Sequence, residues 1–248
     1  SPSCVTDSET ERGFVIIAYG KLGGLELGYG SDLDLVFLHG ASGSADAVTN
    51  GARPIADTVF YARLGQRIIH ILTVLTPAGV LYETDMRLRP SGASGLLVSG
   101  LESFSSYQRQ QAWTWEHQAL VRARVVAGDE KLRAEFEVLR REILMLPRET
   151  EALRHDIAEM RERMRETLDR QKEGLFDLKQ GRGGIADIEF MVQFGVLNWA
   201  HKTPALTEYT DNIRLLEGFA QHLSKADFLS AEDAARLAVD HRHYRAEV

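Results

Sequence analysis

The sequence predicts an α+β protein in which strands and helices are mixed in the first half and helices alone make up the second half. Two stretches of strand length, Phe14–Tyr19 and Gly30–Leu38, are rich in β-branched and aromatic residues. From Gly128 onward, apolar residues recur with a period of about 3.6, which predicts helices. We therefore expect two domains, residues 1–127 with the strands and residues 128–248 forming an all-α bundle.

The composition argues against several classes of protein. The formal net charge is −7, whereas binding to nucleic acid requires a basic surface. Cys4 is the single cysteine, so no internal disulfide and no cysteine-based metal site is possible, which favours a reducing cytoplasm. The most apolar helix candidate, residues 57–75, contains charged side chains and does not predict a membrane span.

Both ends of the sequence indicate a fragment. The start is polar, lacks Met and does not have the pattern of a signal peptide. The chain stops within a charged helical pattern at Val248. We therefore expect the helical bundle to be truncated at its C-terminal end.

The first predicted strand, Phe14–Tyr19, is a continuous apolar run and should be buried. It leads into the glycine-dense turn Gly20–Gly24, whose residues permit positive φ and a close approach of backbone to a ligand. Lys21 offers a charge for a triphosphate. The spacing is not that of a P-loop, and taken alone a structural turn with an exposed lysine is the commoner meaning of this stretch.

The second predicted strand carries two carboxylates. Asp32 and Asp34 point to one face, about 7 Å apart along the chain, and the leucines between and after them point to the other. Such a pair is unfavourable unless a cation lies between the two, and hard oxygen ligands suit Mg²⁺. Gly30 and Ser31 offer backbone N–H groups and a hydroxyl to a phosphate. The alternative is an edge strand with two solvated aspartates.

A loop rich in small residues, 39–53, and an amphipathic helix over residues 57–75 follow, and we expect this helix to pack on the sheet. Residues 80–90 then read as a strand with Glu83, Asp85, Arg87 and Arg89 on one face. Asp85 would be a third carboxylate, and the two arginines would be planar donors to phosphate oxygens. A plain solvated face is the alternative.

The remaining elements are predicted from periodicity and capping residues. We expect a short strand at residues 96–98 and helices over residues 101–111 and 113–126. Asp187 falls in the first turn of a later helix, where an acid is favourable, and Ser230 is a candidate N-cap. Glu116, Arg122 and Arg124 are candidates to line a cleft, although solvated helix charges are the commoner meaning.

Several stretches together resemble one family. A Gly-Ser turn followed by Asp-x-Asp on a strand is typical of polymerase-β-like nucleotidyltransferases, whose domain is a small mixed sheet with flanking helices. The wider pattern closely resembles bacterial glutamine synthetase adenylyltransferases. It comprises AYGKLGGLELGY at 18–29, GSDLDLVFLH at 30–39, DMRLRPSG at 85–92, WTWEHQALVRAR at 113–124 and GGIADIEF at 183–190. One departure is Gly30, where many members carry Asp.

The resemblance implies a reaction and a partner. Members of the family transfer AMP from ATP to a tyrosine of glutamine synthetase, which down-regulates nitrogen assimilation, and each has two related halves. The motif at 113–124 and the Asp-Leu-Asp form resemble the C-terminal, adenylylating half. The alternatives are the adenylyl-removing half, which would release ADP by phosphorolysis, and a non-catalytic nucleotide-sensing or docking module. The PII signal protein is an expected partner of the full-length enzyme.

The resemblance also implies roles for individual residues. Asp32, Asp34 and Asp85 would hold two Mg²⁺ ions, and Asp85 would help to deprotonate the tyrosine. The residues expected to bind the nucleotide are Lys21, Gly30, Ser31, Arg87 and Arg89.

Overall fold

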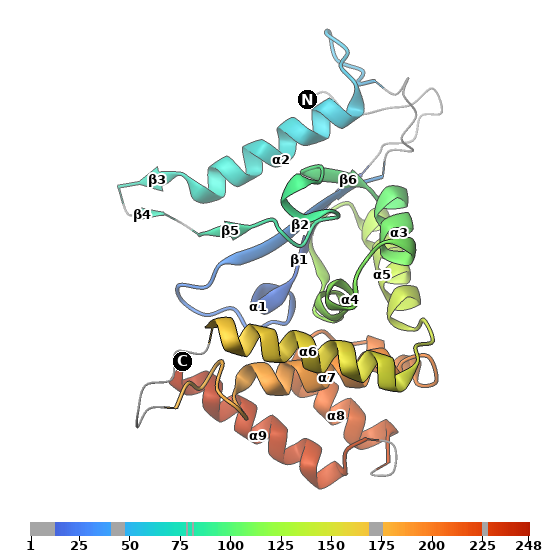
Figure 1. Ribbon diagram of the computed structural model, residues 1–248. Coiled ribbons are helices and arrows are strands. Elements are labelled where there is room, and N and C mark those ends of the chain that lie inside the picture. The colour runs from blue at the N-terminus through green and yellow to red at the C-terminus, as the bar shows by residue number, and fades with distance from the viewer. Residues whose placement is uncertain (1–12, 41–47, 78, 81, 169–175, 225–227) are drawn as a thin grey trace. The chain divides into compact units, whose positions relative to one another are not determined.

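The computed structural model describes residues 13–40, 48–77, 79–80, 82–168, 176–224 and 228–248 (Figure 1). They form two compact units. The sheet unit is Ser1–Ala112 with Ala123–Arg140, and the helical unit is Trp113–Arg122 with Arg141–Val248. Cys4 and residues 41–47 of the predicted loop 39–53 lie outside the described residues. The domain boundary at residue 127 stays a prediction.

The sheet unit is built on a small mixed sheet, which confirms the predicted fold class. Its strand order is β5-β2-β1-β7, and β6 also pairs with β2. The central strand β1 is antiparallel to β2 and β7, whereas β5 and β6 run parallel to β2. The strands are β1 Phe14–Ala18, β2 Leu33–His39, β5 Thr84–Asp85, β6 Val98–Gly100 and β7 Arg124–Gly128.

Helices flank this sheet because β2 alternates between two buried faces. Leu33, Leu35 and Phe37 pack in one core cluster with residues of α2, as the sequence predicted. A Cβ at Gly65 of α2 would lie 2.8 Å from a Val98 methyl carbon, so this glycine allows the helix to lie close to the sheet. The helices of the unit are α1 Gly20–Gly23, α2 Asp57–Thr73, α3 Leu101–Gln110, the single turn η1 Gly92–Ser94 and the first part of α5 Glu130–Leu144.

The predicted strand over residues 80–90 is wrong in length. Only Thr84–Asp85 pairs with β2, because the Asp85 side chain accepts a hydrogen bond from the Arg87 backbone N–H and the chain then turns away. The preceding residues form a separate hairpin of β3 Leu75–Thr76 and β4 Gly79–Val80.

The predicted helix over residues 113–126 is also too long. It ends at Val121, and β7 follows at Arg124–Gly128, paired antiparallel with β1. The alternation of Val125 and its neighbours suits either structure over so few residues. Pairing with the exposed edge of β1 decides the outcome, because it satisfies backbone groups that a helix end would leave without partners.

The helical unit contains only helices and turns among its described residues, as predicted. Its helix α7 is the most buried, with Val192, Val196 and Leu197 fully inaccessible to solvent. Ser230 caps α9 by accepting the Asp233 backbone N–H at 3.0 Å, which confirms that prediction. The elements are α4 Thr114–Val121, the end of α5, α6 Thr150–Leu168, α7 Ile185–Trp199, η2 Pro204–Thr207, α8 Asn212–His222 and α9 Ala231–Glu247.

Within the described residues, none of the helices has both the length and the apolar character that crossing a membrane requires.

Candidate active site

Three carboxylates of the sheet unit converge at the β2–β5 pair. One oxygen from each of Asp32, Asp34 and Asp85 lies within 4.8 Å of the other two. Asp32 is exposed, and the other two side chains are half-buried. Three negative charges this close repel each other unless a cation lies between them, and an all-oxygen donor set is the kind that Mg²⁺ takes. The residues present therefore fit a divalent cation.

The register of the parallel strands brings the acids together. Asp34 on β2 is paired directly with Asp85 on β5. Just before this pair, the backbone N–H of Leu33 donates to the carbonyl of Glu83 at 2.8 Å. Asp32 precedes β2 by one residue and lies on the Asp34 face. Asp85 follows Asp34 by about fifty residues in the sequence, yet the three acids meet at one end of two short parallel strands.

Arg87 holds the Asp85 carboxylate in place. Its backbone N–H donates to Oδ1 at 2.8 Å, and its guanidinium donates to Oδ2 from Nε at 2.7 Å and also from Nη2. The side-chain hydrogen bond from Arg87 lowers the pKa of Asp85, and this outweighs the opposing effect of burial. In return, Asp85 raises the pKa of Arg87, with smaller contributions from Asp34 and Asp32. Asp85 is therefore ionised and fixed in orientation.

Gly20 is a site residue that sequence reasoning missed. It has a φ of +52°, and a Cβ there would lie 2.1 Å from Oδ2 of Asp34. The neighbouring Tyr19 N–H donates to the Asp34 backbone carbonyl at 2.9 Å. The signal in the sequence was the glycine near the end of the first strand. Only the structure shows that the Asp34 carboxylate occupies the space that a side chain at position 20 would need.

Lys21 and Ser31 lie together, although the sequence separates them by ten residues. The Lys21 ammonium donates to the Ser31 hydroxyl at 3.2 Å, and the Gly28 N–H approaches the same oxygen at 3.3 Å. Gly30 has a φ of +72°, which turns the chain between Tyr29 and Ser31. The loop that leads into Asp32 is therefore shaped by this glycine and tied to α1.

Two further arginines of the unit donate to backbone carbonyls of its loops. The Arg89 guanidinium donates to the carbonyls of Met86 at 2.7 Å, Ala93 at 3.0 Å and Gly95 at 3.3 Å. Arg124 donates to the carbonyls of Leu22 and Gly23 at the end of α1, and burial, followed by the nearby Arg133, lowers its pKa. The structure therefore bonds Arg87 to Asp85, whereas Arg89 is bonded to the turn and lowers the pKa of Asp85 only through its charge. Binding of the nucleotide by Arg89 stays a prediction.

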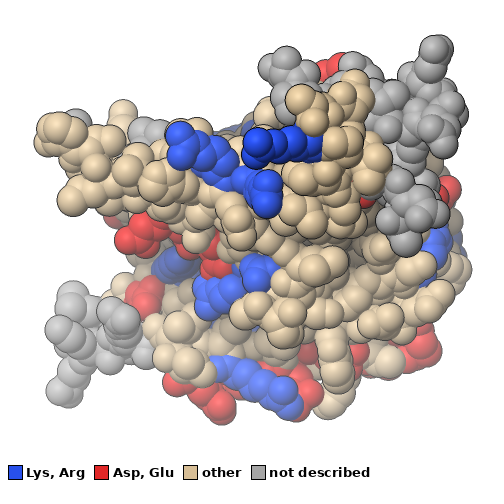
Figure 2. All heavy atoms as spheres, turned by 90° about the horizontal axis from the view of Figure 1, so that it is seen from above, with Lys and Arg blue, Asp and Glu red and all other residues tan. Residues whose placement is uncertain are grey.

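Charges are mixed on the surface. On the face drawn in Figure 2, Lys and Arg side chains are interspersed with Asp and Glu side chains.

The helical unit contains a different kind of acidic site around Asp187. This carboxylate accepts the Gly183 N–H at 2.6 Å and pairs with Arg161 at 2.6 Å and Arg165 at 3.0 Å. Burial alone raises the pKa of Asp187, but these hydrogen bonds and charges outweigh it, so the net shift is downward. Asp187 thus fixes the turn before α7 to α6, beyond the first-turn role predicted from the sequence.

The other acids and bases named from the sequence in this unit are also paired. Glu116 accepts the Trp113 N–H at 2.9 Å and caps α4. The buried Arg122 pairs with Glu189 of α7. Both side chains are buried, so the interpretation as solvated helix charges is wrong for Glu116 and Arg122.

Comparison with known proteins identifies the family. A model described as glutamate-ammonia ligase adenylyltransferase matches residues 2–139, more than half of the chain. The chain belongs to this adenylyltransferase family. Residues 151–246 match a second model, described as GlnD PII-uridylyltransferase. The first match contains all three converging carboxylates, and it confirms the family that the sequence motifs indicated.

Curated relatives agree with this assignment. Proteins named bifunctional glutamine synthetase adenylyltransferase/adenylyl-removing enzyme are 60% identical in Nitrosococcus oceani, 56% in Methylococcus capsulatus and 54% in Hahella chejuensis. The alignments cover 98%, 95% and 94% of this adenylyltransferase-family chain. They cover 25%, 24% and 24% of those proteins, so the chain spans about a quarter of their length. Its correspondence to the C-terminal half stays a prediction.

Proposed function

We propose that this chain transfers AMP from ATP to a tyrosine hydroxyl of glutamine synthetase and releases pyrophosphate. The observation that carries the proposal is the convergence of Asp32, Asp34 and Asp85 within 4.8 Å, inside the part that matches the adenylyltransferase model. The names of the relatives give the acceptor protein. Three carboxylates placed against each other are costly to folding, and a nucleotide-bound cation offsets that cost.

The three acids would hold Mg²⁺, two ions in our proposal. When bound, magnesium neutralises phosphate charge and lowers the pKa of a coordinated hydroxyl. Asp85 is suited to be a ligand, because Arg87 keeps it ionised and oriented. The same lowered pKa makes Asp85 a weaker proton acceptor, so we assign it to the metal rather than to the tyrosine proton.

The other polar groups of the sheet unit would position the substrate. Phosphoryl transfer leaves the protein little covalent work and depends on alignment and charge stabilisation. The tyrosine hydroxyl gives its proton to solvent, its oxygen bonds to the α-phosphorus of ATP, and the bond from that phosphorus to the bridging oxygen breaks, so that pyrophosphate leaves. Lys21 and Ser31, with the backbone of Gly30, would hold the departing phosphates, and the exposed Arg87 would offer a second positive charge.

The wider setting is also part of the proposal. We assign the chain to the adenylylating half, since its motif at residues 113–124 resembles that half. The match of residues 151–246 to the PII-uridylyltransferase model supports regulation of the full-length protein by PII. We propose that it acts in the cytoplasm, where its acceptor is found.

The test is a label-transfer assay. The chain is incubated with Mg²⁺, ATP labelled in the α-phosphate and unmodified glutamine synthetase. We expect label on glutamine synthetase and one pyrophosphate released for each AMP added. A parallel reaction contains adenylylated glutamine synthetase and phosphate. Release of ADP there, without AMP addition in the first reaction, would assign the chain to the adenylyl-removing half. Failure of both reactions by a folded chain that binds ATP would favour a nucleotide-sensing module.

A further inference from the structure

Helix α1 is too short and too rich in glycine to hold its shape by itself. It spans only Gly20–Gly23, about one turn, and so short a helix does not repay the cost of nucleation. Glycine, among the least favourable residues in a helix, stands at both of its ends and again at Gly24. The position of α1 must therefore be set by contacts from outside it.

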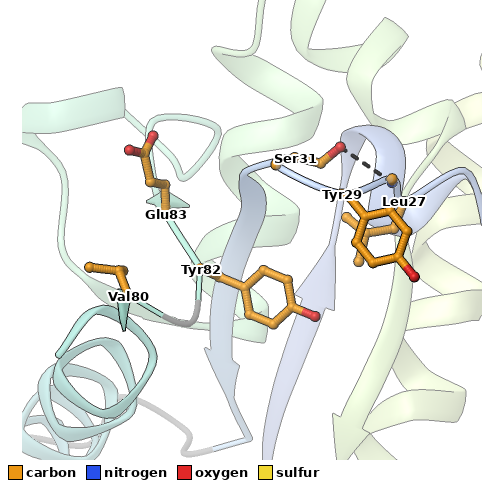
Figure 3. Close-up of a pocket in the computed structure, with 8 residues that line it drawn as sticks. Leu27, Tyr29, Ser31, Val80, Tyr82 and Glu83 are labelled. Atoms are coloured by element: carbon orange, nitrogen blue, oxygen red, sulfur yellow. Dashed lines mark hydrogen bonds between the residues drawn. The ribbon is translucent and has the colours of Figure 1, made fainter. Parts of the chain in front are cut away.

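That position matters because α1 touches two parts of the candidate site. At its start, a Cβ at Gly20 would lie 2.1 Å from Oδ2 of Asp34. In its middle, the Lys21 ammonium donates to the Ser31 hydroxyl at 3.2 Å. Figure 3 shows Ser31 at the wall of a cavity of about 660 Å³, with the hydrogen bond that its hydroxyl accepts from the Gly28 N–H drawn dashed. A shift of α1 would move the lysine away from this hydroxyl.

Arg124 holds the C-terminal end of α1. The last carbonyls of a helix have no partner within the helix, and a cation there is favourable. The Arg124 guanidinium donates from Nε to the Gly23 carbonyl at 3.0 Å and from Nη2 to the Leu22 carbonyl at 2.9 Å. Because the guanidinium is planar, two such bonds fix the direction as well as the distance.

The sheet in turn holds Arg124. Its backbone belongs to β7 and is paired with Ala18 of β1, which is fully buried. Burial and the nearby Arg133 both lower the pKa of Arg124, so this position costs the charged guanidinium some of its hydration. The two carbonyls of α1 are its described partners and offset that cost. The order of support is therefore from sheet to arginine, from arginine to α1, and from α1 to Lys21.

We propose that Arg124 is a positioning residue for the phosphates of ATP, acting through Lys21. It holds α1 so that the Lys21 ammonium stays at the Ser31 hydroxyl, and it does not itself touch the nucleotide. The inference rests on the proposed function in taking Lys21 as a contact of the departing phosphates. The alternative is direct contact between Arg124 and a phosphate, and the two ideas predict different results for a pair of substitutions.

The test measures equilibrium binding of ATP and of AMP to the whole chain by calorimetry, with Mg²⁺ and without glutamine synthetase. Lys21→Met should weaken ATP about tenfold, as the loss of one charged contact allows, and leave AMP unchanged because AMP lacks the departing phosphates. Arg124→Met should weaken ATP about fivefold and also leave AMP unchanged, because the lysine is displaced but keeps its charge.

The deciding variant combines Lys21→Met and Arg124→Met. An arginine that acts through the lysine has nothing left to position, so the double variant should bind ATP about tenfold more weakly than the wild type, as Lys21→Met does alone. Independent contributions would multiply to about fiftyfold.

The matched control is Arg133→Met. Arg133 lies in the same unit and also donates to a backbone carbonyl, that of Val125 at 3.2 Å, but not to α1. Both nucleotides should bind this variant as they bind the wild type. If Arg124→Met does not fold, Arg124→Lys takes its place, since it keeps the charge and loses the planar fork. It should weaken ATP about threefold, and only where Lys21 is present.

The outcomes separate the two proposals. A multiplied loss in the double variant, or AMP weakened as much as ATP by Arg124→Met, would overturn the positioning role even if AMP transfer occurs. Losses that do not multiply, in a chain that transfers no AMP, would overturn the proposed function and leave the role of Arg124 standing. ATP binding that Lys21→Met leaves unchanged would overturn the role of Arg124 together with that of Lys21.

Discussion

The aspartates of the sheet unit and of the helical unit have opposite electrostatic surroundings. In the helical unit, Asp187 is surrounded by the donors that a carboxylate needs, two guanidinium groups and one backbone N–H. In the sheet unit, Asp32, Asp34 and Asp85 are placed within 4.8 Å of one another, and Arg87 is the cation bonded to Asp85. The first arrangement stabilises the fold by itself, whereas the second stores repulsion that a cation can relieve.

The difference teaches how to separate structural from functional acids. Both sites contain aspartates in or beside regular elements, with arginine nearby, and burial alone does not distinguish them. What distinguishes them is the balance of charge within a few ångströms. Substitutions should therefore affect stability at Asp187 and ligand chemistry at Asp34, and the following experiments test that contrast from the largest expected effect to the smallest.

The largest effect is expected for Asp34→Asn. Loss of a metal-binding charge should lower the rate of AMP transfer about a thousandfold, in the range found when a group that stabilises the transition state is removed. The free energy of unfolding should change by less than about 1 kcal/mol, because one of three repelling charges is removed. Transfer assays and urea unfolding check the two expectations. Retained activity would show that the acids are not the metal site.

In the helical unit, Arg161→Met should act on stability instead. Arg161 is buried and bonded to Asp187 and Gln180, so its removal leaves Asp187 with one guanidinium partner and Gln180 with unpaired oxygens, and should lower the free energy of unfolding by about 2–3 kcal/mol. All three tryptophans of the chain lie in this unit, so their fluorescence follows its unfolding in urea. The matched control is Arg163→Met, an exposed residue paired with Glu159, with an expected change below about 0.5 kcal/mol.

Gly20→Ala tests whether the backbone positions Asp34. The new methyl group would collide with Oδ2 of Asp34, so we expect AMP transfer to fall by about a hundredfold, as displacement of a reacting group by about 1 Å can cause. The left-handed φ adds a stability loss of about 1–2 kcal/mol. Gly79→Ala also puts a side chain at a positive φ, here +106°, with nothing within 4 Å, so it should lose stability without loss of transfer. Equal transfer rates in the two variants would contradict the positioning role.

The smallest effect concerns pH. The pKa of Asp187 is lowered in the folded state, so its contribution to stability is present above the pKa of the unfolded chain, about 3.9, and is lost as the pH falls through the folded pKa. Tryptophan-monitored unfolding of the wild type should weaken between about pH 5 and about pH 3 more steeply than that of Asp187→Asn. Parallel profiles for the two proteins would show that the ion pairs do not stabilise the folded state.

Much of the sheet unit could be predicted because its signals are local. The apolar run at Phe14–Ala18, the alternation around Asp32 and Asp34, and the amphipathic pattern of α2 each determine an element within a short window. The acids could also be named in advance, since Asp-x-Asp on a strand is unfavourable without a ligand. The Ser230 cap was predictable for the same reason, because the cap and its N–H are three residues apart.

What failed depends on partners distant in sequence. Strand β7 forms because it pairs with the edge of β1, which lies more than a hundred residues earlier in the sequence. The hydrophobic periodicity within a short window gives no information about such a distant partner. The contacts of Arg89 with the carbonyls of Met86, Ala93 and Gly95 could not be read from the sequence either, and its role at the nucleotide stays a prediction. Gly20 gained its meaning from the Asp34 carboxylate, and Asp187 from two arginines on another helix.

The most direct test of the central claim is a crystal structure with Mn²⁺ in place of Mg²⁺ and an ATP analogue that cannot be cleaved at the α-phosphate. Manganese prefers the same oxygen ligands and gives an anomalous signal that identifies it. We expect anomalous peaks coordinated by Asp32, Asp34 and Asp85 and by the α-phosphate oxygens. Nucleotide and manganese bound elsewhere, with the three carboxylates left without a cation, would contradict the assignment of this cluster as the catalytic centre.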